Sequence, residues 1–568
     1  MVATMTADNI VTQSSALRSY WNKRNTKQYE WYKTIQLVDE LAQENMESFV
    51  SSDPRSAFNL ILHMLNNPRI PHRVPPELIT PDTVIPAGRL SKLLDTAWQD
   101  VFRTYRLSGH TSWMRDAIAF MLVSGWYSVF AMVSQDGQRC IAELWNPGTV
   151  FPMWDDTMTE CAHIVTLSST AAKRMMARNG WTARIPDMAV SLYDYWLLNN
   201  KEVYNGVVLG IQLVKPLTLE PRFSRIPIFT SPVGGLPDTG VLTTGDTWKE
   251  EIGQSSVATA DPVYRSMNKW WTFSMQLLRD TAQSRWFEKS AGGKPILKVA
   301  DLYKRGFIAR MGPNDEVGTI AVPPIPVELR AMQLDMEAML QRAGPPWALF
   351  GAGTQNMTAY MMAQVASGAA QMAQPYHQGV IDLLTDIDNF WLEQIRRYNY
   401  KPYGMEFPKE LPENIQVTAS YDIRIPGDII QRATVARMLD PDFRLSSTRV
   451  TEELFPEVKN PMEEKAQVMA DKAETHPVRS IIALILSLRQ EAATMRKQGN
   501  QAEAARLYEL AANNIEAQLG VTTQPQQPGQ PTQAGQPAGQ GAPRPEVVPN
   551  RETELRPPEE TTQAGGVR

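Results

Sequence analysis

The sequence predicts a mixed α/β subunit in which helices dominate. Three observations support this fold class. Helical periodicity covers much of the first 106 residues, strand-like runs separated by Asn and Gly turns follow up to residue 215, and a long helical run extends from about 358 to 397. With 568 residues, the chain exceeds one ordinary core, so we expect several packed units plus extensions.

The N-terminal part is expected to contain four helices. Apolar residues near one face predict a helix over 15–50. Ser52-Asp53-Pro54 then supplies a capping residue and an early proline for a second helix. A third helix covers about 89–106, and a fourth begins near Thr111 and ends at Gly125, a suitable C-terminal cap.

Strands are expected after Gly125. The run WYSVFAMV is followed by Gln135-Asp136-Gly137-Gln138, whose Asp-Gly pair favours a tight hairpin. Asparagine-containing turns are predicted to separate further strands. Those strands lie near 160–167, 188–198 and 202–215, with turns at Asn199, Asn200 and Asn205-Gly206.

The second half is expected to alternate helices with short connections. An aromatic-rich helix, a glycine-punctuated β module, a second helix, an apolar loop and the long helix follow one another at 261–289, 290–325, 326–343, 344–357 and 358–398. Pro375 is expected to kink the long helix. A strand at 399–426 and helices over 427–520 precede residues 521–568, whose Gln, Pro, Gly and Thr content predicts disorder.

The composition limits the classes of function. Lys plus Arg total 56 against 61 acidic residues, a formal net charge of −5, so a broad cationic DNA-binding surface is not expected. Cys140 and Cys161 do not make a disulfide framework and predict reduced thiols in a cytoplasmic protein. We see no secretion signal, and the most apolar run, 117–133, is shorter than the ~20 residues of a membrane span.

Enzyme motifs and cofactor sites are not evident. Gly292-Gly293-Lys294 fails as a phosphate-binding loop, because Glu288 stands at the first glycine position and Pro295 at the hydroxyl position. The six histidines have no metal-ligand spacing. The acidic cluster Asp382, Asp386 and Asp388 leaves one alternative open, a metal-dependent nuclease. A solvated acidic stripe is the interpretation that we favour.

A long segment has no charged residue. From Ala343 to Ile381 the chain contains no Asp, Glu, Lys or Arg, and small residues are frequent. DNA that must slide cannot be held by many fixed phosphate contacts, because each adds salt-dependent affinity. The segment therefore fits a neutral channel lining built from closely packed helices. The alternative is a buried core helix of a monomer.

Three stretches together resemble the portal proteins of tailed bacteriophages, the head-to-tail connectors of the long-tailed type. The first is DAIAFMLVSGWYSVFAMVSQDGQRCIAELWNPGTVFPMWDD, with Gly125, Pro147, Val150, Pro152 and Asp155 in the order that portals show. The second is the order of helices and loops over 261–398, and the third is LSSTRVTEELFPEVKNPMEEKAQVMADKAE. The resemblance covers about 30–520, although 160–260 does not match strand by strand.

The resemblance implies a non-enzymatic ring, expected to have twelve subunits, that forms a channel for double-stranded DNA at one capsid vertex of a virion. Assembly would take place in the host cytoplasm. The implied partners are the terminase large subunit, a head-completion or adaptor protein, and the major capsid and scaffolding proteins. The implied regions are wing (1–260), stem (261–289), clip (290–325), second stem helix (326–343), tunnel loop (344–357), channel helix (358–398), wing strand (399–426), crown (427–520) and disordered tail (521–568).

The resemblance also implies two sets of site residues. Tunnel-loop residues that would contact DNA are Pro346, Trp347, Leu349, Phe350, Gln355 and Asn356. Clip residues that would dock the terminase and adaptor are Lys294, Lys298, Lys304, Arg305 and Arg310. Two alternatives stay open at these sites: aromatic side chains buried in a helical core, and an ordinary solvated hairpin. For the whole chain, another neck or tail structural protein of a virion is the main rival.

Overall fold

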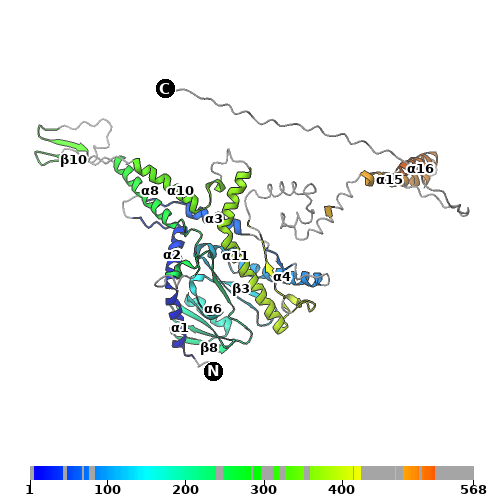
Figure 1. Ribbon diagram of the computed structural model, residues 1–568, viewed down its shortest axis with the longest axis horizontal. Coiled ribbons are helices and arrows are strands. Elements are labelled where there is room, and N and C mark those ends of the chain that lie inside the picture. Colours follow the sequence, from blue (N-terminus) through cyan, green and yellow to red (C-terminus); the bar gives the residue numbers. More distant parts are fainter. Residues whose placement is uncertain are drawn as a thin grey trace, which may run out of the picture. The chain divides into compact units, whose positions relative to one another are not determined.

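The structure is a computed structural model, shown as a ribbon in Figure 1. It forms two compact units, Met1–Pro461 and Met462–Arg568. The described residues are 5–42, 48–66, 70–75, 83–237, 247–282, 286–295, 298, 311–319, 327–350, 359–412, 415–421, 423, 467–468, 477–497 and 502–518. The sequence predictions for 424–466 and for the tail from 521 onward lie outside these residues.

Two helices replace the one that was predicted over 15–50. They are α1 (Ala7–Tyr20) and α2 (Asn22–Gln36). The chain breaks between them at Trp21, whose indole is buried and donates to the Pro152 carbonyl at 2.7 Å. Leu37 ends α2 in the left-handed conformation, with φ 63°. The prediction was wrong because burial of Trp21 against the sheet outweighs continuous helical periodicity.

The next three helices confirm the predictions. They are α3 (Asp53–Leu65), α4 (Val84–Leu107) and α5 (Trp113–Ser124). Ser52 does not cap α3 with its side chain as expected. Instead, the Asp53 amide donates to Ser51 Oγ at 3.2 Å. Gly125 ends α5 at φ 67°, as predicted, and its amide donates to Met121 O at 2.8 Å.

Two antiparallel sheets follow. The first has the strand order β3 (Cys140–Leu144), β2 (Trp126–Val133) and β9 (Ile228–Pro232). The β2–β3 hairpin is the predicted one, and Gly137 takes φ 70° in its turn. The second sheet runs in sequence order: β4 (Val150–Trp154), β5 (Met158–Leu167), β6 (Val190–Asn199), β7 (Glu202–Leu209) and β8 (Gln212–Leu219). Helix α6 (Ser169–Asn179) connects β5 to β6.

The predicted turn at Asn205-Gly206 is wrong, whereas Asn200 takes a positive φ in the β6–β7 turn as expected. Asn205 and Gly206 lie inside β7, at a bulge in its pairing with β8. Asn205 is buried there and donates from Nδ2 to Asp194 Oδ1 at 2.6 Å. A strand can therefore hold an Asn-Gly pair when a buried acceptor satisfies the amide.

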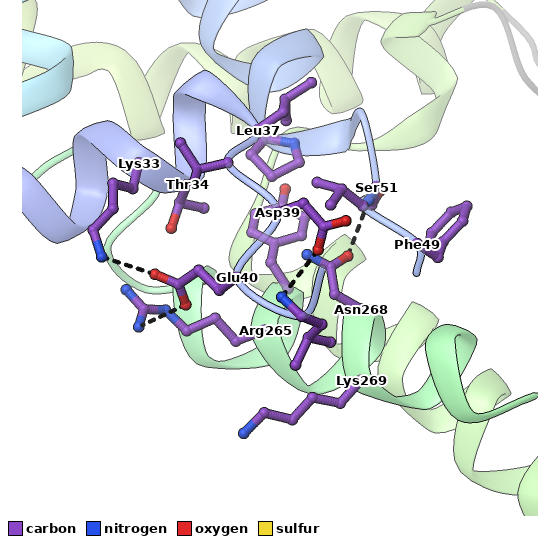
Figure 2. A pocket seen from close by; sticks show the side chains of 15 residues that line it. Lys33, Thr34, Leu37, Asp39, Glu40, Phe49, Ser51, Arg265, Asn268 and Lys269 are labelled. Carbon is purple, nitrogen blue, oxygen red and sulfur yellow. Dashed lines mark hydrogen bonds and ion pairs between the residues drawn. The ribbon is translucent and has the colours of Figure 1, made fainter. Parts of the chain in front are cut away.

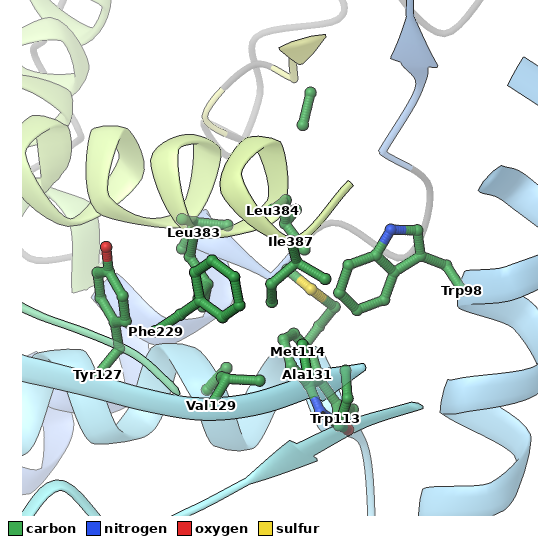
Figure 3. Packing of buried hydrophobic residues seen from close by; sticks show 14 of the residues in the cluster. Trp98, Trp113, Met114, Tyr127, Val129, Ala131, Phe229, Leu383, Leu384 and Ile387 are labelled. Carbon is green, nitrogen blue, oxygen red and sulfur yellow. Dashed lines mark hydrogen bonds between the residues drawn. The ribbon is translucent and has the colours of Figure 1, made fainter. Parts of the chain in front are cut away.

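The core lies between α11 (Ala359–Tyr398), α5 and the first sheet. Figure 3 shows Leu383 and Ile387 of α11 above Val129 and Met114. Pro375 lies inside α11, and the expected kink there stays a prediction. Part of the strand predicted after α11 is present as β12 (Thr418–Ala419), which pairs with β1 (His72–Arg73).

The segment between the second sheet and α11 contains α7 (Trp248–Glu251), α8 (Asp261–Ala282), β10 (Trp286–Lys289), β11 (Glu316–Thr319), α10 (Val327–Ala343) and a short 3-10 turn, Trp347–Phe350. The helix predicted over 261–289 ends at Ala282, and its last four residues form β10 instead. Trp286 and Phe287 pair with Thr319 and Gly318 of β11, so strand pairing overrides the helical pattern.

The second unit contains a helical hairpin, α15 (Pro477–Lys497) and α16 (Ala502–Gln518). Ala492, Ala505 and Ala512 are fully buried between the two helices. In the described part of the chain, no helix is long and apolar enough to cross a membrane. Cys140 and Cys161 are buried free thiols.

Candidate functional site

Helices α8 and α10 pack against each other through a small apolar cluster. Its buried members are Ala260, Tyr264, Met267, Met336 and Leu340. Other large apolar side chains of the two helices are exposed on the single chain: Phe273, Leu278, Met332, Leu334 and Met339. The pair therefore buries only one side of each helix and leaves apolar surface for another contact.

The base of α8 is fixed to the preceding part of the chain around a cavity of about 120 Å³ (Figure 2). Asn268 Oδ1 accepts from the Ser51 amide at 2.9 Å, and Thr272 Oγ1 accepts from the Phe49 amide at 3.0 Å. The side chains of Asn268 and Thr272 thus accept hydrogen bonds from two backbone amides of the segment 48–51. This arrangement holds the segment 48–51 along the helix.

Charged groups strengthen the same junction. Thr34 Oγ1 donates to Asp261 Oδ1 at 2.6 Å, and Arg265 Nε lies 3.1 Å from Asp261 Oδ2. Lys33 Nζ pairs with Glu40 at 2.9 Å, as Figure 2 also shows. The end of α2 and the first turn of α8 are therefore joined by a network of bonds, and each exposed pair in it contributes little alone.

The loop after α10 starts in a buried position and then becomes exposed. Gly344 and Pro345 are buried, and the Gly344 amide donates to Leu340 O at 2.8 Å. Trp347 and Phe350 are 39% and 46% exposed on the single chain. Pro346 and Leu349 are half-buried, and Gln355 and Asn356 lie outside the described residues.

The first half of α11 has an exposed stripe without charge. Described positions that are exposed recur every three or four residues, as expected for one helix face. They are Met361, Gln364, Ser367, Gly368, Gln371, Gln374, Pro375 and Gln378. Ala369, Ala373 and Val380 are buried on the opposite side. The sequence has no charged residue from 343 to 381, and the structure adds that the exposed face of α11 in this segment is rich in glutamine.

The basic residues between β10 and β11 are only partly described. Lys294 and Lys298 are exposed, whereas Lys304, Arg305 and Arg310 lie outside the described residues. The β10–β11 ribbon is anchored by Asp315, which accepts from the Ala291 and Gly312 amides at 2.9 and 2.8 Å. These hydrogen bonds lower the pKa of the Asp315 carboxyl.

The three acidic residues Asp382, Asp386 and Asp388 of α11 differ in burial. Asp382 and Asp386 are exposed, whereas Asp388 is fully buried and accepts from Trp98 Nε1 at 2.7 Å. Among the described residues, no group of three His, Cys, Asp or Glu side chains could hold a metal ion. Asp388 therefore points into the core and does not join the exposed carboxylates of Asp382 and Asp386 in one cluster.

Sequence reasoning missed two buried polar groups. His72 Nδ1 lies 2.5 Å from Asp388 Oδ2, a pair that joins β1 to α11. Arg24 is buried against Trp21 and Trp126 and donates to Val150 O at 2.9 Å. Burial lowers the pKa of Arg24 to about 9. No local motif marks either group, because Asp388 and Val150, to which they bind, are distant in sequence.

Comparisons with known proteins gave structural matches only. No family model matches the chain, and no curated protein matches it. A chain in the neck of an empty gene transfer agent (GTA) particle, computed with C6 symmetry, is similar at 12% identity and a TM-score of 0.41, over 71% of this chain and 90% of that chain. A chain of the native GTA virion is similar at 12% identity and a TM-score of 0.38, over 71% and 89%.

A third match is a chain in the neck of the native GTA particle, computed with C12 symmetry. It has 12% identity and a TM-score of 0.34, over 70% of this chain and 99% of that chain. TM-scores below 0.5 do not establish a shared fold.

Proposed function

We propose that this protein is a portal-type structural subunit, which forms a ring at one capsid vertex of a phage-like virion and lets double-stranded DNA pass. The observation that carries the proposal is the uncharged exposed stripe of α11 between Met361 and Gln378. Charged residues make up 21% of the chain, so a long exposed helix face without any of them is unusual in this molecule.

A neutral face suits a moving polyanion. Double-stranded DNA carries about one negative charge per 1.7 Å of axis, and each lysine or arginine contact adds affinity that slows movement. Glutamine amides can exchange hydrogen bonds with water and phosphate without a fixed ion pair. A ring of α11 stripes would therefore line a channel without slowing the DNA through fixed ionic contacts.

Ring formation is supported by apolar surface that one chain leaves exposed. Phe273 and Leu278 on α8, and Met332, Leu334 and Met339 on α10, are exposed on the single chain. In a closed ring these helix faces of one subunit would meet a different face of the next subunit, head to tail. We propose twelve subunits, as the resemblance to portals implies.

The loop and the β ribbon would serve the channel and its partners. Trp347 and Phe350, half exposed after α10, would project towards the DNA. The β10–β11 ribbon exposes Trp286 and Phe287. Since an isolated two-stranded ribbon is marginally stable, a partner that covers it is expected. We propose the terminase large subunit and a head-completion protein there, with capsid and scaffolding proteins at other surfaces.

Negative-stain microscopy and a packaging assay test the proposal. The purified protein should form rings with a central hole, and a native monomer would contradict this and favour another neck or tail component. Gln371→Lys with Gln374→Lys should leave rings intact but reduce packaged DNA severalfold. Gln99→Lys with Gln36→Lys, at exposed positions of α4 and α2, is the matched control. Equal packaging by both double variants would contradict the channel assignment.

A further inference from the structure

One end of the five-stranded sheet has a charge opposite to that of the whole chain. Between β5 and β6 the chain leaves the sheet and forms α6 and the loop that follows it. Residues 168–189 contain four basic side chains, Lys173, Arg174, Arg178 and Arg184, and a single acidic one, Asp187. The chain as a whole has a formal net charge of −5. The segment is therefore a local basic surface on an acidic protein.

This surface is held firmly on the sheet. Half-buried Met175, Met176, Trp181 and Ile185 pack on a cluster that contains Val190 and Leu209. Gln212, in the first position of β8, also binds the backbone of Arg184 at two points. Its Oε1 accepts from the Arg184 amide at 2.9 Å, and its Nε2 donates to the Arg184 carbonyl at 2.8 Å. The backbone of Arg184 is thus fixed to the start of β8 by these two hydrogen bonds.

The basic side chains are available to a partner. Arg174 and Arg184 are exposed, and the described residues include no ion pair for either. Lys173 Nζ lies 3.2 Å from Asp187, and both side chains are largely exposed. Arg178 lies 3.8 Å from Glu143 across the surface. Because exposed pairs of this kind contribute little stability, these cations can change partner at low cost.

Exposed apolar side chains lie at the same end of the sheet. Ile211, in the β7–β8 turn, is 83% exposed, and Met188, just before β6, is 69% exposed. The Gly210 amide donates to Ser191 O at 2.8 Å, which places this turn beside the start of β6. A nucleic-acid partner, which would bind through its phosphates, would not explain why Ile211 and Met188 are exposed beside the basic residues. Protein interfaces are enriched in both arginine and methionine, so a protein partner fits better.

We propose that residues 168–189 and the β7–β8 turn form a docking surface for an acidic segment of another protein that also carries aliphatic side chains. Carboxylates of that segment pair with Arg174 and Arg184, and its aliphatic groups cover Ile211 and Met188. The proposal needs neither ring formation nor DNA passage, so its failure and that of the portal function are distinguishable.

Fluorescence anisotropy with the full-length protein tests the proposal. The probe is a short fluorescein-labelled peptide of alternating glutamate and leucine. A glutamate–serine peptide of equal length tests the apolar contribution, and a short DNA duplex tests phosphate binding. The glutamate–leucine peptide should bind tightest and the duplex weakest. No binding of either peptide, or tighter binding of the duplex, would overturn the proposal.

Variants locate the binding. Arg174→Glu with Arg184→Glu should weaken binding of the glutamate–leucine peptide about tenfold or more, which corresponds to about 1.4 kcal/mol. Arg103→Glu with Arg106→Glu, two exposed positions on α4, is the control with the same change in net charge and should have little effect. Ile211→Ser should weaken binding of the glutamate–leucine peptide only.

Equal losses of peptide binding in both charge-reversal pairs would show non-specific attraction and overturn the assignment. Loss of self-association as the main effect of these variants would also overturn it, because the occupant would then be a second copy.

Discussion

The His72 imidazole and the Asp388 carboxylate form a buried pair that connects β1 to α11. His72 Nδ1 lies 2.5 Å from Asp388 Oδ2, while Trp98 Nε1 donates to Oδ1 at 2.7 Å. The Trp98 and His72 rings also stack, with 5.8 Å between centroids. The carboxylate is therefore satisfied on both oxygens, without contact with water.

Removal of this carboxylate should destabilise the protein strongly. Breaking a buried pair leaves the other partner uncompensated and typically costs about 3–5 kcal/mol. We expect Asp388→Asn to reduce the free energy of unfolding by an amount of this size in urea titrations. Asp382→Asn is the control, because that carboxylate is exposed and accepts one bond from Gln378. Similar losses in the two variants would contradict a special role for Asp388.

His163 should make the fold sensitive to acid. Its ring is buried and stacks on Trp145 with 3.8 Å between centroids, and burial lowers its pKa to about 3. The unfolded chain protonates this residue near pH 6.5 whereas the folded chain does not, so stability is lost as the pH falls from about 6.5 towards 3. His163→Gln should show a shallower loss of stability over this range in pH-dependent urea unfolding. If the free energy of unfolding fell equally with pH in the variant and the parent protein, the prediction would be contradicted.

Two glycines with the same backbone conformation should respond differently to alanine. Gly125 and Gly180 end helices at φ 67° and 68°. A Cβ on Gly125 would lie 2.3 Å from the Gln254 amide nitrogen, whereas a Cβ on Gly180 would meet nothing within 4 Å. Gly180→Ala should therefore cost only the backbone strain of the left-handed conformation, about 1–2 kcal/mol. Gly125→Ala should cost several times more, measured by thermal unfolding, and equal melting temperatures would contradict this contact.

The attachment of the segment 48–51 to α8 should depend on Asn268. Asn268→Ala leaves the Ser51 amide, in a buried residue, without its acceptor, which costs about 1–3 kcal/mol. We expect lower stability and faster proteolysis near residue 50. Ser266→Ala is a matched control on the exposed side of α8, where Ser266 Oγ donates only to the Pro262 carbonyl. Unchanged proteolysis in Asn268→Ala would show that other contacts hold the segment.

Local backbone chemistry explains which predictions succeeded. Gly125 and Gly137 were placed correctly because each adopts a positive φ that glycine tolerates. Asn200 was placed correctly for a related reason, since asparagine also enters the left-handed region. The predicted turn at Asn205 failed because a tertiary contact with Asp194 accommodates the residue within a strand.

The candidate channel face could be predicted in part. The absence of charge over 343–381 is a property of the sequence, whereas the exposed stripe of α11 required the packing of Ala369, Ala373 and Val380. The buried pair of His72 and Asp388 could not be predicted, because nothing near either residue identifies the other. The basic surface at Arg174 and Arg184 was also missed, since only the pairing of β6 to β8 brings it beside Ile211.

The position of α11 in the chain determines the order of events during synthesis. Leu383, Leu384 and Ile387 complete the core over Val129, yet they are translated long after β2. Helices α8 and α10 leave the ribosome in between, before α11 covers that core. The apolar surface of α5 and β2 therefore stays without its α11 contacts for some 250 residues of translation, which takes tens of seconds at about 5–20 residues per second. Apolar surface that is exposed in this way is prone to aggregation.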